Sequence, residues 1–183
     1  MTCMTPADRD EFASFAAAAA PRLRRTAYLM CGNWHSAEDL TQITLTKLFA
    51  SWNRIRRHDN LSNYATRTLL NAYLAERRRR SWTELPTADP PERAARIDCP
   101  EQRMDIMAAL AELPPRARAV VVLRYWSDQS IEQVADLLGC SPGNVKSQSA
   151  RALQRLRQLM GEDLTRSAGD PGPGRAVTGV SHD

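Results

Sequence analysis

The sequence predicts an all-α protein built from two small helical domains joined by a flexible linker. Alanine, leucine and arginine dominate the 183 residues, whereas aromatic residues make up 6% and there are only eight glycines. That composition is typical of helical proteins and argues against a β-rich fold. Apolar residues also recur at helical spacing on both sides of one proline-rich segment, which places the division between the domains there.

The first domain is expected over residues 8–82, as a four-helix-like bundle. A first helix is predicted over 8–30, with Asp8 as a possible cap, followed by a turn at CGNWHS. Ser36 is the expected cap of a second helix, because serine favours that position. A third helix is predicted over 64–82 and ends in an arginine cluster. The broad apolar face of the second helix consists of Leu40, Ile43, Leu45, Leu48, Phe49 and Trp52.

Residues 83–102 are predicted to be the flexible linker. The segment has four prolines, alternating charge and no apolar period. Fully extended, it would span roughly 65–70 Å, enough to hold two domains at separate sites on a large object. Helical spacing resumes over 103–160, the second domain, and the Gly- and Pro-rich stretch 161–183 is expected to be a disordered tail.

The second domain contains the pattern of a helix-turn-helix. Ile131 to Leu138 carries apolar residues on one face, and Gly139 follows where a left-handed backbone ends a helix. Ser141 is then the expected cap of the next helix, with Pro142 at its first position, where the missing N–H costs nothing. Val145 is expected to fill the crossing between the two helices.

The second helix of this motif has one polar side with little bulk. With Val145, Ser149, Ala152 and Leu156 facing inward, the outward positions are Gly143, Lys146, Ser147, Ala150, Arg151 and Gln154. Small residues let the backbone approach a groove, serine can bond a base edge or phosphate, and the two cations can neutralise phosphates. This side is therefore expected to touch the DNA major groove. A plain helical hairpin with a polar outer face is the alternative.

The charge distribution suits a protein with two polyanion contacts. The net charge is +4, and residues 1–82 hold 13 basic and 7 acidic residues, a net of +6. Residues 104–160 hold 7 and 5, a net of +2, and the segments after each block are acidic. Random scatter of charge is the alternative.

Nothing in the sequence predicts a catalytic residue, a metal site or a cofactor. The four cysteines lie 28, 68 and 41 residues apart, too far for a zinc knuckle or a redox pair. His35, His58 and His182 have no carboxylate or cysteine at ligand spacing, so an enzyme is not expected. The first residues lack the cations and apolar run of a signal peptide, and no apolar stretch is long enough to enter a membrane. A cytoplasmic location is therefore expected.

Three segments in order resemble the extracytoplasmic-function (ECF) group of bacterial RNA polymerase sigma factors. AEDLTQITLTKLFASW resembles the group's second region, and NYATRTLLNAYLAERRRR resembles the promoter-melting helix that follows. ELPPRARAVVVLRYWSDQSIEQVADLLGCSPGNVKSQSARALQRLR is similar to the fourth region. The resemblance covers about residues 9–160. Within the group, GCSPGNVKSQSARAL looks most like the actinobacterial envelope-stress branch.

The resemblance implies an alternative sigma factor that directs promoter-specific initiation without catalysis. Its implied partners are core RNA polymerase, through the β′ and β subunits, promoter DNA and an anti-sigma factor. The implied polymerase-binding residues are Asp39, Gln42, Leu45 and Lys47. The implied downstream-element residues are Arg67, Asn71, Arg77, Arg78, Arg79 and Arg80. The implied upstream-element residues are Gly143, Asn144, Lys146, Ser147, Ala150, Arg151 and Gln154.

Simpler readings of these residues stay open at this point. Asp39 could serve only the helix dipole, Asn71 could be a satisfied buried polar residue, and the arginine cluster could be an exposed helix end. Ser149 and Ala150 depart from the family pattern, which puts the upstream sequence preference in doubt. The rival function is a helix-turn-helix repressor with a helical dimerisation domain, which would protect a palindrome without polymerase.

Overall fold

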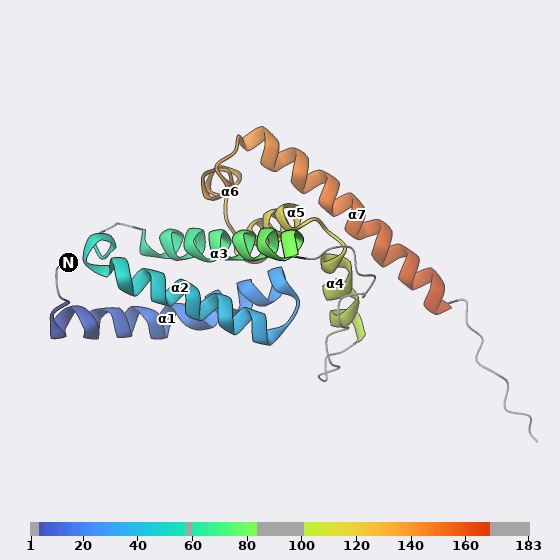
Figure 1. Ribbon diagram of the computed structural model, residues 1–183. Helices are drawn as coiled ribbons and strands as arrows, with labels where there is room; N and C mark the ends of the chain where they lie inside the picture. The colour runs from blue at the N-terminus through green and yellow to red at the C-terminus, as the bar shows by residue number, and fades with distance from the viewer. Residues whose placement is uncertain (1–3, 58–59, 84–100, 169–183) are drawn as a thin grey trace, which may run out of the picture.

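All regular elements in the described part of the chain are helices, as the sequence predicts (Figure 1). The structure is a computed structural model, and it describes residues 4–57, 60–83 and 101–168. Three long helices form what we call the N-terminal bundle, and shorter helices with one long one form the C-terminal body. The bundle consists of α1 (Pro6–Cys31), α2 (Trp34–Ile55) and α3 (Leu61–Thr83). The body consists of α4 (Glu101–Ala111), α5 (Pro115–Val121), the π-helical turn η1 (Val122–Trp126), α6 (Ile131–Leu138) and α7 (Pro142–Ala168).

The N-terminal caps of α1 and α2 each lie three residues before the position that the sequence suggested. Thr5, and not Asp8, caps α1: the Asp8 amide donates to Thr5 Oγ1 at 3.2 Å, and the Thr5 amide donates to Asp8 Oδ2 at 3.0 Å. Asn33, and not Ser36, caps α2, because its Oδ1 accepts the Ser36 amide at 2.7 Å. Asp8 and Ser36 occupy the third helical position, where polar residues are also favoured, so their residue types alone misplaced the caps.

The bundle has three helices within the described residues, so the four-helix-like expectation is wrong. α2 packs against both α1 and α3. Trp52 is only 1% exposed, and its ring packs in a T-shaped arrangement with that of Phe12 at a centroid distance of 5.1 Å. The long α1 and α3 fill the places on either side of α2, so no further helix is needed to bury it.

The buried face of α2 differs from the expected apolar face. Ile43 and Phe49 are 42% and 43% exposed, whereas Thr41 and Thr44 are buried. The two threonine hydroxyls donate to the carbonyls of Ala37 and Leu40 at 2.7 Å, so their polar atoms are satisfied inside the core. The predicted buried face, which counted only apolar residues, is therefore rotated toward the exposed side of the helix.

The predicted helix-turn-helix is present between α6 and α7. Gly139 ends α6 with φ 60°, in the left-handed region, and the Ser141 Oγ accepts the Asn144 amide at 3.2 Å. Val145 is fully buried at the crossing. α7 runs to Ala168, eight residues beyond Met160, where the sequence placed its end. Gly161 alone does not stop the helix, because Glu162 to Arg166 are compatible with helical continuation.

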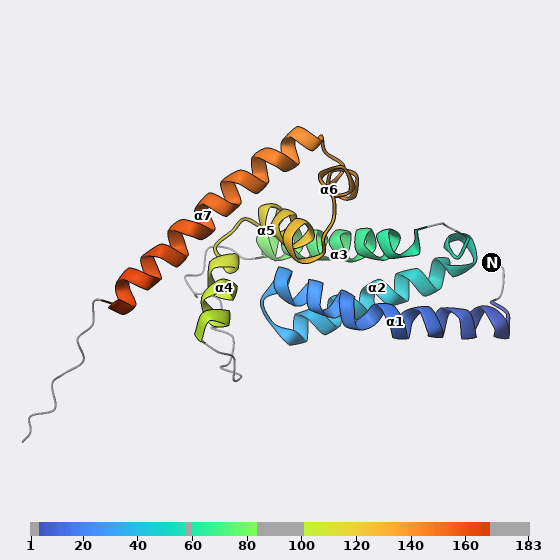
Figure 2. The same cartoon turned by 180° about the vertical axis from the view of Figure 1, so that it is seen from behind.

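The two halves of the molecule pack against each other. Figures 1 and 2 show α6 and the start of α7 lying over α3 when seen from opposite sides. Contacts join α3 to α5 and α6, and α1 to α4, α5 and η1. Buried side chains of both halves form one continuous apolar cluster. Most of the predicted linker, residues 84–100, and the end of the predicted tail, residues 169–183, lie outside the described residues.

Candidate polymerase and nucleic-acid interfaces

α7 presents an exposed polar side and a buried apolar side, as its sequence predicts. Val145, Ser149 and Ala152 are buried, and Leu156 is half-buried. The seven expected upstream-element residues are all exposed: Gly143, Asn144, Lys146, Ser147, Ala150, Arg151 and Gln154. Their roles stay predictions, and the helix brings all of them to one accessible surface.

The first turns of this surface carry small side chains, and their polar side chains already form hydrogen bonds within α7. A Cβ added to Gly143 would meet only Ser141 Oγ, at 3.9 Å, so the backbone there is open to approach. The Ser147 hydroxyl donates to the Gly143 carbonyl at 3.0 Å. The oxygen of Ser147 is then left with acceptor capacity, which suits a base amino group or another donor. Gln148 Nε2 donates to Asn144 Oδ1 at 2.6 Å and orients that side chain.

A basic groove adjoins the α7 surface, and sequence reasoning missed three of its residues. Arg124, Tyr125 and Arg157 line it together with Lys146 and Ala150. Tyr125 is 53% exposed, and its hydroxyl lies 3.2 Å from the Ser149 Oγ. This contact explains the hydroxyl at an inward position of α7, because the two oxygens satisfy each other. The signal available in the sequence was the Arg-Tyr-Trp run just before α6.

On α3, three of the expected downstream-element residues share one face. Arg67, Asn71 and Arg78 lie within about 40° of one another around the helix and along about 16 Å of its length, and all three are exposed. The exposure of Asn71 excludes the alternative of a buried polar residue. Such a row of guanidinium and amide groups can bind phosphates and base edges.

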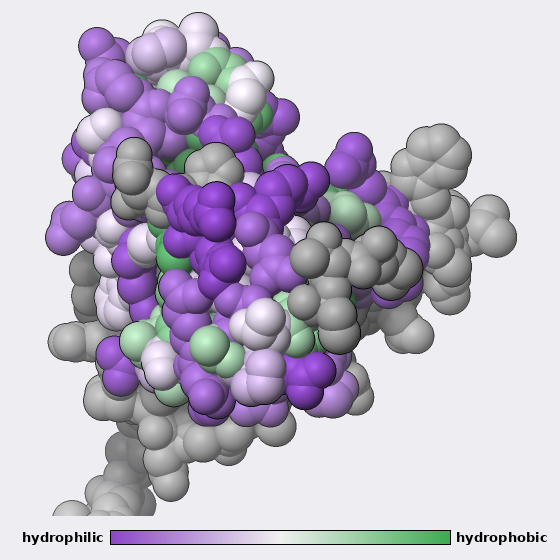
Figure 3. Space-filling model, turned by 90° about the vertical axis from the view of Figure 1, so that its left-hand side faces the viewer, coloured by the Kyte–Doolittle hydropathy of each residue, from purple (hydrophilic) through white to green (hydrophobic). Residues whose placement is uncertain are grey.

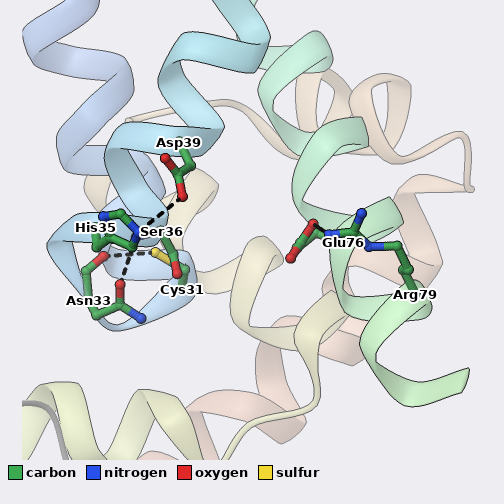
Figure 4. Close-up of polar contacts among 7 residues, drawn as sticks. All are labelled: Cys31, Asn33, His35, Ser36, Asp39, Glu76 and Arg79. Carbon is green, nitrogen blue, oxygen red and sulfur yellow. Dashed lines mark hydrogen bonds and ion pairs between the residues drawn. The ribbon is translucent and has the colours of Figure 1, made fainter. Parts of the chain in front are cut away.

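The arginine cluster does not act as a uniform exposed end. Arg77 is half-buried. Arg79 donates to Glu76 at 2.9 Å (Figure 4). Arg78 is exposed, and its Nε donates to the Leu74 carbonyl at 3.3 Å. The side chain of Arg80 lies outside the described part of the structure.

Arg67 reaches across to the C-terminal body. Its Nη2 donates to the Asp136 carbonyl at 2.8 Å and lies 3.4 Å from the Asp136 carboxylate. Asp136 belongs to α6, the first helix of the helix-turn-helix. A residue expected to bind one promoter element is therefore held by the motif expected to bind the other.

The residues expected to bind polymerase do not all lie on one side of α2. Asp39 and Gln42 are exposed in one stripe, which also carries the exposed Ile43 and Phe49 that sequence reasoning assigned to the core. Leu45 is half-buried and Lys47 exposed at opposite edges of the stripe, about 160° apart around the helix. His35 Nε2 lies 3.6 Å from the Asp39 carboxylate, one turn along α2 (Figure 4), so the expectation that His35 has no carboxylate partner is wrong.

The side of the molecule seen in Figure 3 has no concentrated apolar site, because hydrophilic residues dominate it and apolar residues are scattered over it. Among the described residues, no group of three or more His, Cys, Asp or Glu side chains could hold a metal ion. The Cys31 thiol donates to the Asn33 carbonyl at 3.2 Å (Figure 4), and Cys31 and Cys140 are not joined in a disulfide. No helix in the described ranges has the length and apolar character needed to cross a membrane.

Comparison with known proteins gives one family for both halves. A family model described as Sigma-70 region 2 matches residues 15–83, and one described as Sigma-70 region 4 matches residues 103–156. The RNA polymerase sigma-E factor of Streptomyces coelicolor is 35% identical over 158 residues, covering 84% of this chain and 89% of the relative. The ECF RNA polymerase sigma factor EcfG of Rhodopseudomonas palustris is 32% identical over 171 residues, covering 88% and 92%.

A solved structure is similar across both halves as well. It is the co-crystal structure of the sigma factor RpoE in complex with the anti-sigma factor NepR from Bartonella quintana. The match has a TM-score of 0.66 and 28% sequence identity, and it covers 84% of this chain and 98% of the other.

Proposed function

The chain belongs to the ECF group of RNA polymerase sigma factors, and from this membership we propose how its surfaces divide the work of an alternative sigma factor. It binds core RNA polymerase and directs promoter-specific transcription initiation. The observation that carries this function is the pairing of a region-2 match over 15–83 with a region-4 match over 103–156 in one helical chain. A repressor would need only the second of these.

The α2 stripe is the proposed contact with the β′ subunit of core polymerase. Asp39 and Gln42 supply polar groups, and Ile43 and Phe49 supply exposed apolar area beside them. Apolar side chains surrounded by polar ones are typical of protein interfaces. Lys47 and Leu45 flank the stripe and would contact its edges. The two domains over 8–82 and 103–160 and the linker 83–102 remain part of the proposal, as does a second contact with the β subunit.

The DNA contacts divide between α3 and α7. The row formed by Arg67, Asn71 and Arg78 would hold the opened strand of the downstream element, with Arg77, Arg79 and Arg80 nearby. The exposed face of α7 would enter the major groove of the upstream element, where its small first turns allow close approach. Arg124 and Arg157 extend the basic surface beside it.

The regulator of this chain is proposed to be an anti-sigma factor, since the similar RpoE was crystallised with one. Proteins of this group are transcription regulators, and we infer that this one has no enzymatic activity and works in the cytoplasm, where it would meet core polymerase.

Co-purification with core polymerase tests the proposed α2 contact. Asp39→Arg should weaken core binding by about tenfold, because it reverses a charge within the stripe. Asp10→Arg makes the same change on α1, near the other end of the α1–α2 hairpin, and should leave the affinity unchanged. Equal affinities for the two variants would show that the stripe is not the contact. Failure of the unaltered chain to bind core would reject the sigma function itself.

A further inference from the structure

The C-terminal body lies on the N-terminal bundle and contacts Arg67, a residue proposed above to bind nucleic acid. We propose that this closed arrangement is a self-inhibited form, in which Asp136 of α6 withholds Arg67 of α3 from nucleic acid until the two halves separate. The proposal rests on the role proposed above for Arg67. It adds a regulatory contact within the chain, independent of any other protein.

Asp136 offers Arg67 the same acceptors that a nucleic acid would offer. The guanidinium has a carbonyl oxygen at 2.8 Å and a carboxylate oxygen at 3.4 Å. Phosphates likewise present anionic oxygens to arginine, so the two ligands compete for one group. Asp136 lies in the last turn of α6, where the helix dipole disfavours an anion. The negative charge of Asp136 therefore does not stabilise α6 itself.

Further contacts hold the halves together, beside the continuous apolar cluster that includes buried side chains of both. Arg118 is buried, and it donates to the carbonyl of Met30 in α1 at 2.9 Å and to those of Ala111 and Leu113 in the C-terminal body at 2.5 and 3.2 Å. Leu29 of α1 packs against the second apolar cluster, whose buried members all belong to the C-terminal body: Leu110, Leu113, Val121 and Ala152. Closure thus has an apolar part and a polar part, and among the ion pairs of the described residues the Arg67–Asp136 pair is the one that joins the halves, at an exposed position.

The closed arrangement also fixes the distance between the two DNA surfaces. Only Gly139, Cys140 and Ser141 separate α6 from α7, so the α7 surface stays beside α3 as long as α6 does. A sigma factor that contacts an opened strand and an intact duplex at separate promoter elements must move them apart. The predicted linker is long enough for that movement.

Charge reversal at Asp136 tests the proposal in the full chain. The Asp136 side chain is 86% exposed and an arginine suits the last turn of a helix, so Asp136→Arg should fold. Glu132→Arg is the matched control, with the same change of charge on the same helix, where the native side chain bonds Ser130. The readouts are the radius of gyration from small-angle X-ray scattering and the affinity for a labelled single-stranded oligonucleotide of mixed sequence.

Asp136→Arg should expand the free protein and bind the oligonucleotide about two- to fivefold more tightly than Glu132→Arg, the range expected for loss of one exposed ion pair. If the apolar contact keeps Asp136→Arg compact, adding Leu29→Ala should open it; Leu29→Ala with Glu132→Arg is then the control. The proposal is overturned if neither Asp136→Arg variant gains affinity over its control, whether or not it expands. Both readouts omit polymerase, so they are independent of the core-binding test of the sigma function.

Discussion

Individual side chains determine what each surface of this sigma factor can recognise. On α7, Ser147 uses its proton on the Gly143 carbonyl and is left as an acceptor, whereas Arg151 is an exposed cation. An acceptor at a base edge discriminates between bases, and a cation near a phosphate binds all sequences alike. The proposal therefore assigns different functions to adjacent turns of one helix.

Substitution of these two residues should separate affinity from preference. Arg151→Ala should weaken promoter binding about equally for all upstream sequences and lower the salt dependence of the affinity by about one phosphate contact. Ser147→Ala should change the preferred base at one position by about 1–3 kcal/mol, because it removes the acceptor. Binding to a library of randomised upstream sites by the polymerase complex measures both. The reverse assignment of effects would contradict the proposed orientation of α7.

Asp8 should make stability depend on pH at the start of α1. Hydrogen bonds from the Thr5 amide and hydroxyl, and then the charge of Arg56, hold the pKa of the Asp8 carboxyl below its usual value. A lowered folded-state pKa stabilises the protein above the unfolded pKa, near 4, and the stabilisation is lost as the pH falls through the folded value.

Asp8→Asn should therefore lower Tm at pH 7, and the difference from wild type should shrink as the pH is lowered below about 4. Asp10→Asn, an exposed site two residues along α1, is the control for the loss of one carboxylate. Thermal unfolding followed by circular dichroism gives the values. A Tm difference for Asp8→Asn that is constant across this range would refute the assignment.

At the scale of elements, the turn between α6 and α7 orients the α7 surface that is proposed to contact DNA. Gly139 has φ 60° with no atom within 4 Å of an added Cβ, so only backbone strain limits substitution there. Gly143 lies in the helix and has an unstrained backbone, and the space beside it is open, so the protein itself can accommodate a side chain at this position. We therefore expect the two glycines to act differently, Gly139 in folding and Gly143 in the proposed approach to DNA.

Alanine at each glycine should give opposite effects on stability and binding. Gly139→Ala should cost about 1–2 kcal/mol of unfolding free energy, the cost of a left-handed residue with a side chain. Gly143→Ala should stabilise by up to about 1 kcal/mol through helix propensity, yet weaken upstream DNA binding because a methyl group lies at the groove. Denaturant unfolding and promoter binding measure the pair. A stable Gly139→Ala variant, or unimpaired DNA binding by Gly143→Ala, would contradict this division.

The element scale also shows what the sequence could and could not predict. Turn signals at Gly139, Ser141 and Pro142 placed the helix-turn-helix, because these residues act through local backbone geometry. The predicted orientation of α2 was wrong because it left out Thr41 and Thr44. Their hydroxyls donate to backbone carbonyls within the helix, and only these hydrogen bonds identify the two residues as core residues. The exposed surface of α7 was predicted, since Val145 and Ala152 fix its inward side.

At the scale of the whole molecule, the packing of the two halves was not predictable. Periodicity reports which face of a helix is buried and not which helix buries it. The Arg67–Asp136 contact joins positions 69 residues apart, and neither residue type singles out the other as its partner. The Arg118 contact with Met30 spans 88 residues. Contacts of this kind depend on the arrangement of the complete fold.

The whole-molecule account is that a closed two-part chain opens on core polymerase and brings it to a promoter. Run-off transcription with purified core enzyme and a template carrying the promoter tests this most directly. The account predicts a specific transcript only when core and this chain are both present, and a larger yield from Asp136→Arg than from Glu132→Arg when core is limiting. No specific transcript with the chain added, together with a symmetric footprint on DNA in the absence of polymerase, would contradict it and identify a repressor instead.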